Sequence, residues 1–138
     1  MGQGPWNIYC QSGQTLIEVE ALYTRAYALY QGGKANEAAE IFQLLCTKDP
    51  LQPIYWAGFA SSLQESSEWE LACEAWAMDA LLEPANPTPH FHAAQCCWHL
   101  GKLSDAALAL KEAKKRIADP QHPLAGTIDL LENSWRVK

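Results

Sequence analysis

Residues 26–42 read AYALYQGGKANEAAEIF, and the landmarks of this stretch return at one fixed interval along the chain. The alanines, the bulky apolar residue and the closing proline all recur in register: Ala26, Ala60 and Ala94; Ala38, Ala72 and Ala106; Phe42, Trp76 and Leu110; Pro50 and Pro84. We call this interval, the step from Ala26 to Ala60, the repeat period. Gly33 and Gly101 are two periods apart, with Ser67 midway between them. A fixed period of this length indicates one supersecondary unit that is repeated along the chain.

The residue types in these columns favour a helix-turn-helix unit repeated three times. Alanine at two columns lets two antiparallel helices approach closely, and the bulky column at Phe42 fills the space toward the next unit. Proline ends the second helix of a unit because it lacks an amide donor and clashes with the preceding turn. The pattern resembles the tetratricopeptide repeat, whose usual tryptophan is present as Trp56. We therefore expect an all-α tetratricopeptide-repeat superhelix.

The repeat register predicts the boundaries of each unit. The repeats span 19–52, 53–86 and 87–120, with helices over 19–31, 35–48, 53–66, 69–82, 87–100 and 103–117. Residues 123–136 are predicted to form a capping helix that covers the end of the stack with one apolar face: Leu124, Ile128, Leu131 and Trp135. Residues 19–138 are thus one domain, and residues 1–18 are predicted to be a flexible lead.

Local signals refine this register. Three short polar residues near the starts of second helices are predicted to cap free amides: Asn36, Ser67 and Ser104. Two residues depart from the pattern, because Arg25 and Asp79 stand at columns that are usually apolar or small.

The composition excludes several classes of protein. The chain of 138 residues is 49% apolar and has a formal net charge of −6, so it has ample apolar surface to bury and is a poor ligand for nucleic acid. No stretch approaches the roughly 20 apolar residues of a membrane span, and no membrane insertion is expected. The five irregularly spaced cysteines fit reduced thiols in the cytosol better than a disulfide framework.

Three tyrosines of the first helix share one face. Tyr23, Tyr27 and Tyr30 follow an i, i+4, i+7 spacing. Such a stripe is usually core, but the repeat register already assigns core packing to the stripe that contains Ala26. The tyrosines are therefore predicted to line the concave surface. Together with inward-facing polar side chains, they suit an extended peptide, because rings pack on apolar side chains while amides and hydroxyls bind its backbone.

Several local strings resemble a particular repeat family. The strings LYTRAYALYQGGK (22–34), IFQLLC (41–46), YWAGFA (55–60) and FHAAQC (91–96) are similar to those of class II type III secretion chaperones, which bind the translocator proteins of bacterial injection machines. The resemblance covers residues 19–118.

This resemblance implies a chaperone of the bacterial cytoplasm that uses neither ATP nor a cofactor. It would hold an extended hydrophobic segment of a translocator, of Pro-x-Leu-x-x-Pro character, and keep translocators soluble and apart before secretion. The columns of the inner face give the predicted peptide-binding residues: Tyr23, Tyr27, Tyr30, Ala57, Ser61, Gln64, Phe91, Gln95 and Trp98. Family members often dimerise through their N-terminal region, so residues 1–18 are a candidate homodimer contact.

Other functions have weaker support in the sequence. No acid-base pair, phosphate-binding loop or nucleophile motif indicates an enzyme. His92, Cys96 and His99 share one helix face and offer zinc ligands, but ordinary repeat packing explains these residues and no metal is expected. Two alternatives stay open: a generic tetratricopeptide adaptor that reads a C-terminal carboxylate, and a needle-subunit chaperone of the same secretion system.

Overall fold

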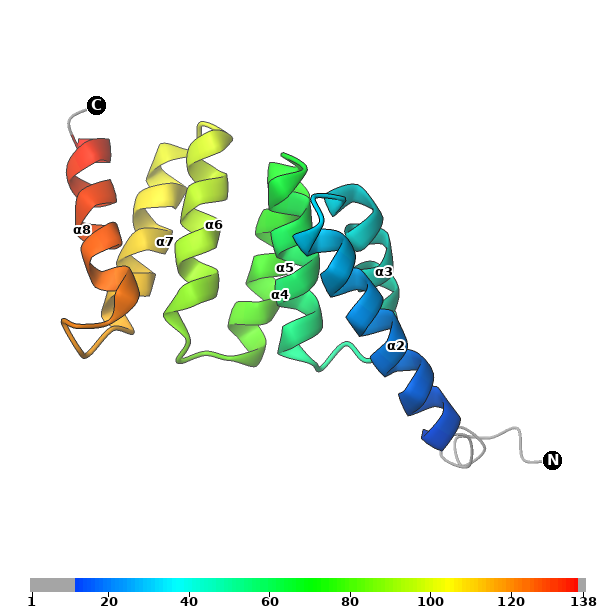
Figure 1. Cartoon of the computed structure of the whole chain (residues 1–138). Helices are drawn as coiled ribbons and strands as arrows, with labels where there is room; N and C mark the ends of the chain where they lie inside the picture. The colour runs from blue at the N-terminus through cyan, green and yellow to red at the C-terminus, as the bar shows by residue number, and fades with distance from the viewer. Residues whose placement is uncertain (1–11, 137–138) are drawn as a thin grey trace.

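Seven α-helices follow one another within residues 12–136, the part of the chain that the computed structural model describes. Their bounds are α2 (Ser12–Gln31), α3 (Ala35–Lys48), α4 (Pro53–Glu65), α5 (Trp69–Leu82), α6 (Pro87–His99), α7 (Leu103–Lys115) and α8 (Pro123–Arg136). The helices stack side by side from α2 and α3 at one end to α8 at the other (Figure 1). The predicted all-α repeat architecture is confirmed. None of these helices is long and apolar enough to cross a membrane.

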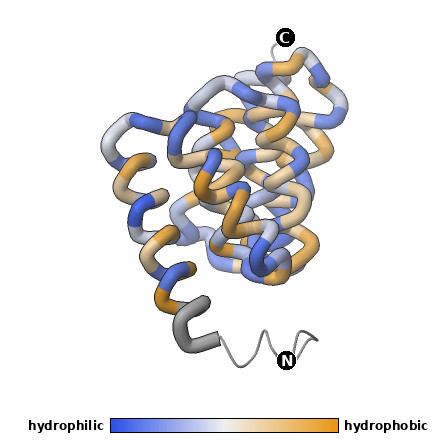
Figure 2. The backbone as a smooth tube through the Cα atoms, turned by 90° about the vertical axis from the view of Figure 1, so that its right-hand side faces the viewer, coloured by the Kyte–Doolittle hydropathy of each residue, from blue (hydrophilic) through white to orange (hydrophobic). Residues whose placement is uncertain are grey.

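The alanine columns make the tight helix contacts of the core. Hydrophobic and hydrophilic residues alternate along the helices (Figure 2), as expected for helices that bury one face. Both alanine columns are buried throughout: Ala26, Ala60 and Ala94; Ala38, Ala72 and Ala106. Ile128 of α8 stands one repeat period after Ala94 and is buried in its turn. The predicted apolar face of α8 therefore packs as expected against a cluster that includes Leu110 of α7.

The turns inside the three repeats are built alike. Gly33, Ser67 and Gly101 all have positive φ angles, of 82°, 61° and 77°. The amide after each of them donates to a carbonyl five residues earlier, as in Lys34 N to Leu29 O at 2.8 Å, which satisfies a helix-end carbonyl. Glycine adopts this conformation without strain, whereas a serine at the same place is uncommon.

The predicted caps at Asn36, Ser67 and Ser104 are wrong. The N-cap residues of α3, α5 and α7 are Lys34, Glu68 and Lys102, and none of them makes a side-chain capping hydrogen bond. Each of these helices begins directly after the glycine-type turn, which leaves no room for a conventional cap. A side-chain cap does occur at α6, where Asn86 accepts a hydrogen bond from the amide of Thr88.

Helix α2 begins seven residues before the predicted start at residue 19. Residues 12–18 are helical, so the first helix is longer than predicted; residues 1–11 of the predicted flexible lead lie outside the described residues. Ile17 is 68% exposed, whereas Val19 packs into the core cluster around Phe42. Val19 thus joins the core at the residue where the repeat register starts.

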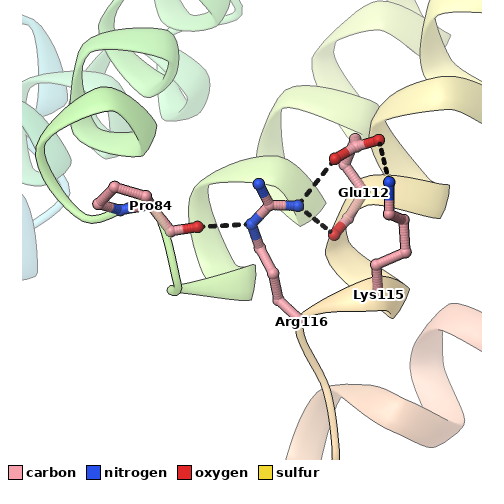
Figure 3. A network of polar contacts seen from close by, with 4 residues as sticks. All are labelled: Pro84, Glu112, Lys115 and Arg116. Atoms are coloured by element: carbon pink, nitrogen blue, oxygen red, sulfur yellow. Dashed lines mark hydrogen bonds and ion pairs between the residues drawn. The ribbon is translucent and has the colours of Figure 1, made fainter.

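An arginine links the second repeat to the third. Arg116, which caps the end of α7, donates through Nε to the carbonyl of Pro84 in the α5–α6 loop at 2.6 Å and through Nη1 to Glu112 Oε1 at 2.8 Å (Figure 3). Lys115 pairs with the same carboxylate at 3.2 Å. The contact satisfies a loop carbonyl just beyond the end of α5 and fixes the spacing between the two repeats.

Candidate peptide-binding groove

A tyrosine-walled pocket of about 270 Å³ lies between α2 and α4. We call it the N-terminal pocket. Five predicted site residues line it: Tyr23, Tyr27, Tyr30, Ala57 and Ser61. The three tyrosines come from one face of α2, and Ala57 and Ser61 come from successive turns of the facing helix α4. The i, i+4 spacings on the two helices thus place all five side chains at one hollow, as predicted.

The tyrosine rings form a continuous aromatic wall. The ring centroids of Tyr23 and Tyr27 are 6.0 Å apart, and those of Tyr27 and Tyr30 are 6.4 Å apart, both in tilted orientations. Tyr27 is 45% exposed, whereas Tyr23 and Tyr30 are half-buried and also pack on the core cluster of the first repeat. The tyrosine stripe therefore serves the core and the pocket together, with Tyr27 offering the most accessible ring.

The hydroxyls of Tyr23 and Tyr30 keep their protons at neutral pH. Burial raises the pKa of Tyr23 and of Tyr30 above the ordinary value of 10.0, and the charge of Glu65 adds to the effect at Tyr30. Each hydroxyl is therefore available both to donate and to accept a hydrogen bond. The pocket combines apolar ring faces with neutral polar groups, which is suitable for an uncharged peptide backbone and an apolar side chain.

Three further residues of the N-terminal pocket were not among the predicted site residues. They are Phe42, Ile54 and Gly58. The ring of Phe42 lies against Gly58 so closely that any β-carbon at residue 58 would overlap it. The repeat register assigned Phe42 only to packing between repeats. Gly58 has no side chain, so it gave no chemical signal. Gly58 stands one repeat period before His92, and comparing these two positions could have identified it.

A second hollow of about 520 Å³ lies further along the same inner surface, between α4, the start of α5, α6 and α8. We call it the C-terminal pocket. The predicted site residues Gln64, Gln95 and Trp98 line it. The centroids of Trp98 and Trp135 are 4.6 Å apart in a stacked pair, so the capping helix supplies part of this wall.

The two glutamines, Gln64 and Gln95, are hydrogen-bonded to each other and to neighbouring side chains. Gln64 Nε2 donates to Gln95 Oε1 at 3.2 Å, and Gln64 Oε1 accepts from Trp76 Nε1 at 2.9 Å. His92 Nδ1 donates to Gln95 Oε1 at 3.0 Å, and burial lowers the pKa of His92, which favours the neutral ring. Their predicted role of binding peptide amides is thus largely replaced by a role in positioning the pocket wall.

The prediction that Phe91 lines the groove is wrong. Its side chain is 5% exposed and packs with Leu110 and Ile128 in the core cluster that α8 closes. Phe91 occupies the same repeat column as Tyr23 and Ala57. The register thus places it correctly on α6, but the capping helix and α7 cover it, so no surface is left for a peptide.

The histidines and cysteines of α6 do not form a metal centre. His99 stacks on Trp69 with ring centroids 3.9 Å apart, His92 stacks on Trp76 at 4.6 Å, and Cys96 is fully buried. Across residues 12–136, no group of three or more His, Cys, Asp or Glu side chains is placed to hold a metal ion. His92 and His99, whose shared helix face suggested zinc ligands, belong to two separate ring stacks.

Comparisons with known proteins agree with the predicted repeat. Residues 19–50 match the tetratricopeptide repeat family. Low calcium response locus protein H of Yersinia pestis is 33% identical over 101 residues, which are 73% of this chain and 60% of that protein. The chain thus spans less than two thirds of the length of this relative.

Two solved structures share most of the fold. PcrH of Pseudomonas aeruginosa, solved with the chaperone binding region of PopD, is 30% identical with a TM-score of 0.81 and covers 87% of this chain and 92% of that one. The chaperone SycD of Yersinia enterocolitica, solved with a peptide of the translocator YopD, is 27% identical with a TM-score of 0.81 and covers 87% and 93%. On these grounds the chain belongs to the family of tetratricopeptide-repeat chaperones of type III secretion translocators.

Proposed function

We propose that this protein is a chaperone of the bacterial cytoplasm that holds an extended apolar segment of a secreted translocator in its inner groove. Binding keeps the translocator soluble and apart from its partners until secretion, and the protein itself carries out no chemical reaction. The observation that carries the proposal is the N-terminal pocket, whose wall is formed by Tyr23, Tyr27 and Tyr30. It is consistent with the solved relatives, which are described as bound to translocator segments.

The pocket is suited to one or two apolar anchors. Its volume of about 270 Å³ admits a leucine or proline side chain with neighbouring backbone. Each buried anchor contributes about 1.5–3 kcal/mol, and ordering a flexible segment costs about 2–5 kcal/mol. An isolated short peptide should therefore bind in the micromolar range or more weakly, and a full translocator with more contacts should bind more tightly.

The charge of the groove argues against the adaptor alternative. Recognition of a C-terminal carboxylate requires cationic side chains, whereas neither pocket has a lysine or arginine among its lining residues. The nearest formal charge is the carboxylate of Glu65 in the C-terminal pocket. A carboxylate-ended ligand would be repelled there.

The test is co-expression of the protein with each translocator of the same secretion system, followed by co-purification. Tyr27→Ala removes the most exposed ring of the wall and should weaken client binding by about 5- to 100-fold. Tyr27→Phe keeps the ring and should bind nearly as well as the wild type. Isothermal titration with a purified client fragment gives the ratio.

A matched control replaces an exposed apolar residue outside the groove. Leu108 of α7 is exposed and lines neither pocket, so Leu108→Ala should leave client binding unchanged. All three variants should melt within a few degrees of the wild type, because both residues are exposed. Equal client retention by Tyr27→Ala and Leu108→Ala would contradict the groove assignment, and co-purification of a needle subunit in place of a translocator would favour that alternative.

A further inference from the structure

The C-terminal pocket has walls made of stacked aromatic rings. Trp69 and His99 lie 3.9 Å apart at an interplanar angle of 2°, and Trp98 and Trp135 lie 4.6 Å apart at 7°. All four rings line the same hollow of about 520 Å³. Because each ring is held by its stacking partner, the faces it presents are fixed before any ligand arrives.

The charge of this pocket has one sign. Glu65 supplies its carboxylate, His99 is the other titratable group of the lining, and the lining contains no lysine or arginine. The influence of Glu65 extends to the N-terminal pocket, where its charge contributes to the raised pKa of Tyr30. Glu65 therefore stands between the two pockets, and nothing in either lining neutralises it.

Aromatic faces beside a carboxylate form a receptor for cations. The face of an indole ring carries a partial negative charge and attracts guanidinium and ammonium groups. The aliphatic stem of an arginine or lysine side chain also packs on indole rings while its charged head stays near water. Glu65 gives such a head an ionic partner, and the whole-chain charge of −6 adds long-range attraction.

The two pockets are close enough to be filled by one segment. Ser61 lines the N-terminal pocket and Glu65 lines the C-terminal one, four residues later on α4. That separation is about 6 Å along the helix axis, and an extended peptide advances about 3.3 Å per residue. A side chain about two to four residues from the apolar anchor would therefore reach the C-terminal pocket.

We propose that the C-terminal pocket binds an arginine or lysine side chain of the client segment whose apolar anchor occupies the N-terminal pocket. The inference rests on the proposed function and adds to it the chemical character of the client. The client segment is then amphipathic along its length, with an apolar anchor and a basic residue nearby.

The first test probes the pocket without the client. Nα-acetyl-arginine amide is titrated into the folded, full-length protein, and the indole N–H signals are followed by NMR, with Nα-acetyl-citrulline amide as a neutral probe of the same shape. The signals of Trp69, Trp98 and Trp135 should shift with the arginine probe and stay in place with citrulline. Equal shifts with both probes, or shifts confined to other tryptophans, would overturn the inference.

Two charge variants sharpen the result. Glu65→Gln should weaken binding of the arginine probe by about three- to tenfold. Glu74→Gln makes the same change of net charge at a residue of α5 that lines neither pocket, so it should have no effect beyond a small loss that high salt removes. If both variants weaken binding equally, the attraction is that of the whole chain and the pocket is not the site.

A charge-reversing variant, Glu65→Lys, compared with Glu74→Gln, separates this inference from the proposed function. In co-purification, Glu65→Lys should release a translocator that the wild type and Glu74→Gln retain. A client that binds equally well to all three overturns the inference while leaving the proposed function standing. If no translocator binds even to the wild type, the proposed function fails, and the inference about the client fails with it.

Discussion

The two interfaces between successive repeats fill the same columns with different chemistry. At the first, the ring of Phe42 packs closely against the bare backbone of Gly58. At the second, one repeat period later, Trp76 stacks on His92 with centroids 4.6 Å apart and donates a hydrogen bond to Gln64. At this column, the first junction is closed by a ring packed on bare backbone, and the second by ring stacking and a hydrogen-bonded network.

This difference shows in the side chains that line the groove at each junction. A glycine opposite Phe42 lets the second repeat approach the first without occupying the space beside α2, and the tyrosines then surround the N-terminal pocket. At the second junction, His92, Gln95 and Gln64 are joined by hydrogen bonds, and the two glutamines form part of the wall of the C-terminal pocket. A buried polar network of this kind fixes one arrangement of the repeats, because leaving one of its members unpaired is costly.

The largest effect is expected from removing the ring that closes the first junction. Phe42 is fully buried, so Phe42→Ala should lower the free energy of unfolding by about 3–5 kcal/mol through lost burial and the cavity left behind. It should also enlarge the N-terminal pocket and weaken client binding. Thermal and urea unfolding measure the loss. A melting temperature near that of the wild type would contradict the close packing of this junction.

The second-largest effect is expected from Asp79, a buried carboxyl group that stands one repeat period after Leu45. Asp79 is 3% exposed and its Oδ1 has no hydrogen-bond partner among residues 12–136. Burial, with a smaller contribution from Glu83, raises its pKa from 3.8 to about 6. The folded protein therefore binds a proton more readily than the unfolded chain does.

The sign of the pH dependence follows from that shift. The contribution of Asp79 to stability is present in full below about pH 4 and is lost as the pH rises to about 6, a change of roughly 2–3 kcal/mol. Asp79→Asn should remove this part of the pH dependence and raise the stability at pH 7.5. Urea unfolding between pH 4 and pH 8 measures both, and parallel curves for the two proteins would refute the assignment.

A single methyl group tests the shape of the first junction. Gly58→Ala should destabilise the protein by about 1–3 kcal/mol, because the new β-carbon overlaps the Phe42 ring. The double variant with Phe42→Leu should recover part of that loss. Gly126→Ala is the matched control: the residue stands two periods later in α8 with open space around it, so alanine should stabilise α8 by up to about 1 kcal/mol.

The smallest effect belongs to the turn of the second repeat. Ser67 adopts a φ of 61° where the other two repeats have glycine, so Ser67→Gly should relieve strain and stabilise the protein by about 0.5–1 kcal/mol. Gly33→Ala, at the same column of the first repeat, should destabilise by a similar amount. Differential scanning calorimetry resolves both shifts. If both substitutions stabilised the protein, the positive φ angle would not be what determines stability at these two positions.

The sequence predicted most of the fold because the repeat acts as an internal alignment. Helix boundaries from residue 35 onward agree to within two residues, since each column is observed three times and one irregular residue cannot shift the register. The start of α2 was missed because residues 12–18 precede the first repeated column. The capping residues were missed because the turn conformation, and not a polar side chain, ends and begins these helices.

The candidate site was predictable where it depends on one helix pair. The spacing of Tyr23, Tyr27 and Tyr30 placed them at the pocket, because all three lie on the face of α2 that faces α4. Phe91 has the same register but is covered by α8 and α7, whose packing no single column reveals. The pairing of Gln64 with Gln95 joins residues of different repeats, and a column pattern does not show which side chains meet across a junction.

The burial of Ile128 in the alanine column has a consequence for how such a chain can change in length. Helix α8 sits in the register of the first helix of a further unit, with a large residue where that unit would have alanine. If one whole repeat were duplicated ahead of α8, the last repeat would present the same packing surface to α8. The groove would then be longer by one repeat. The stack can therefore be lengthened by whole repeats, and α8 can cap each longer stack.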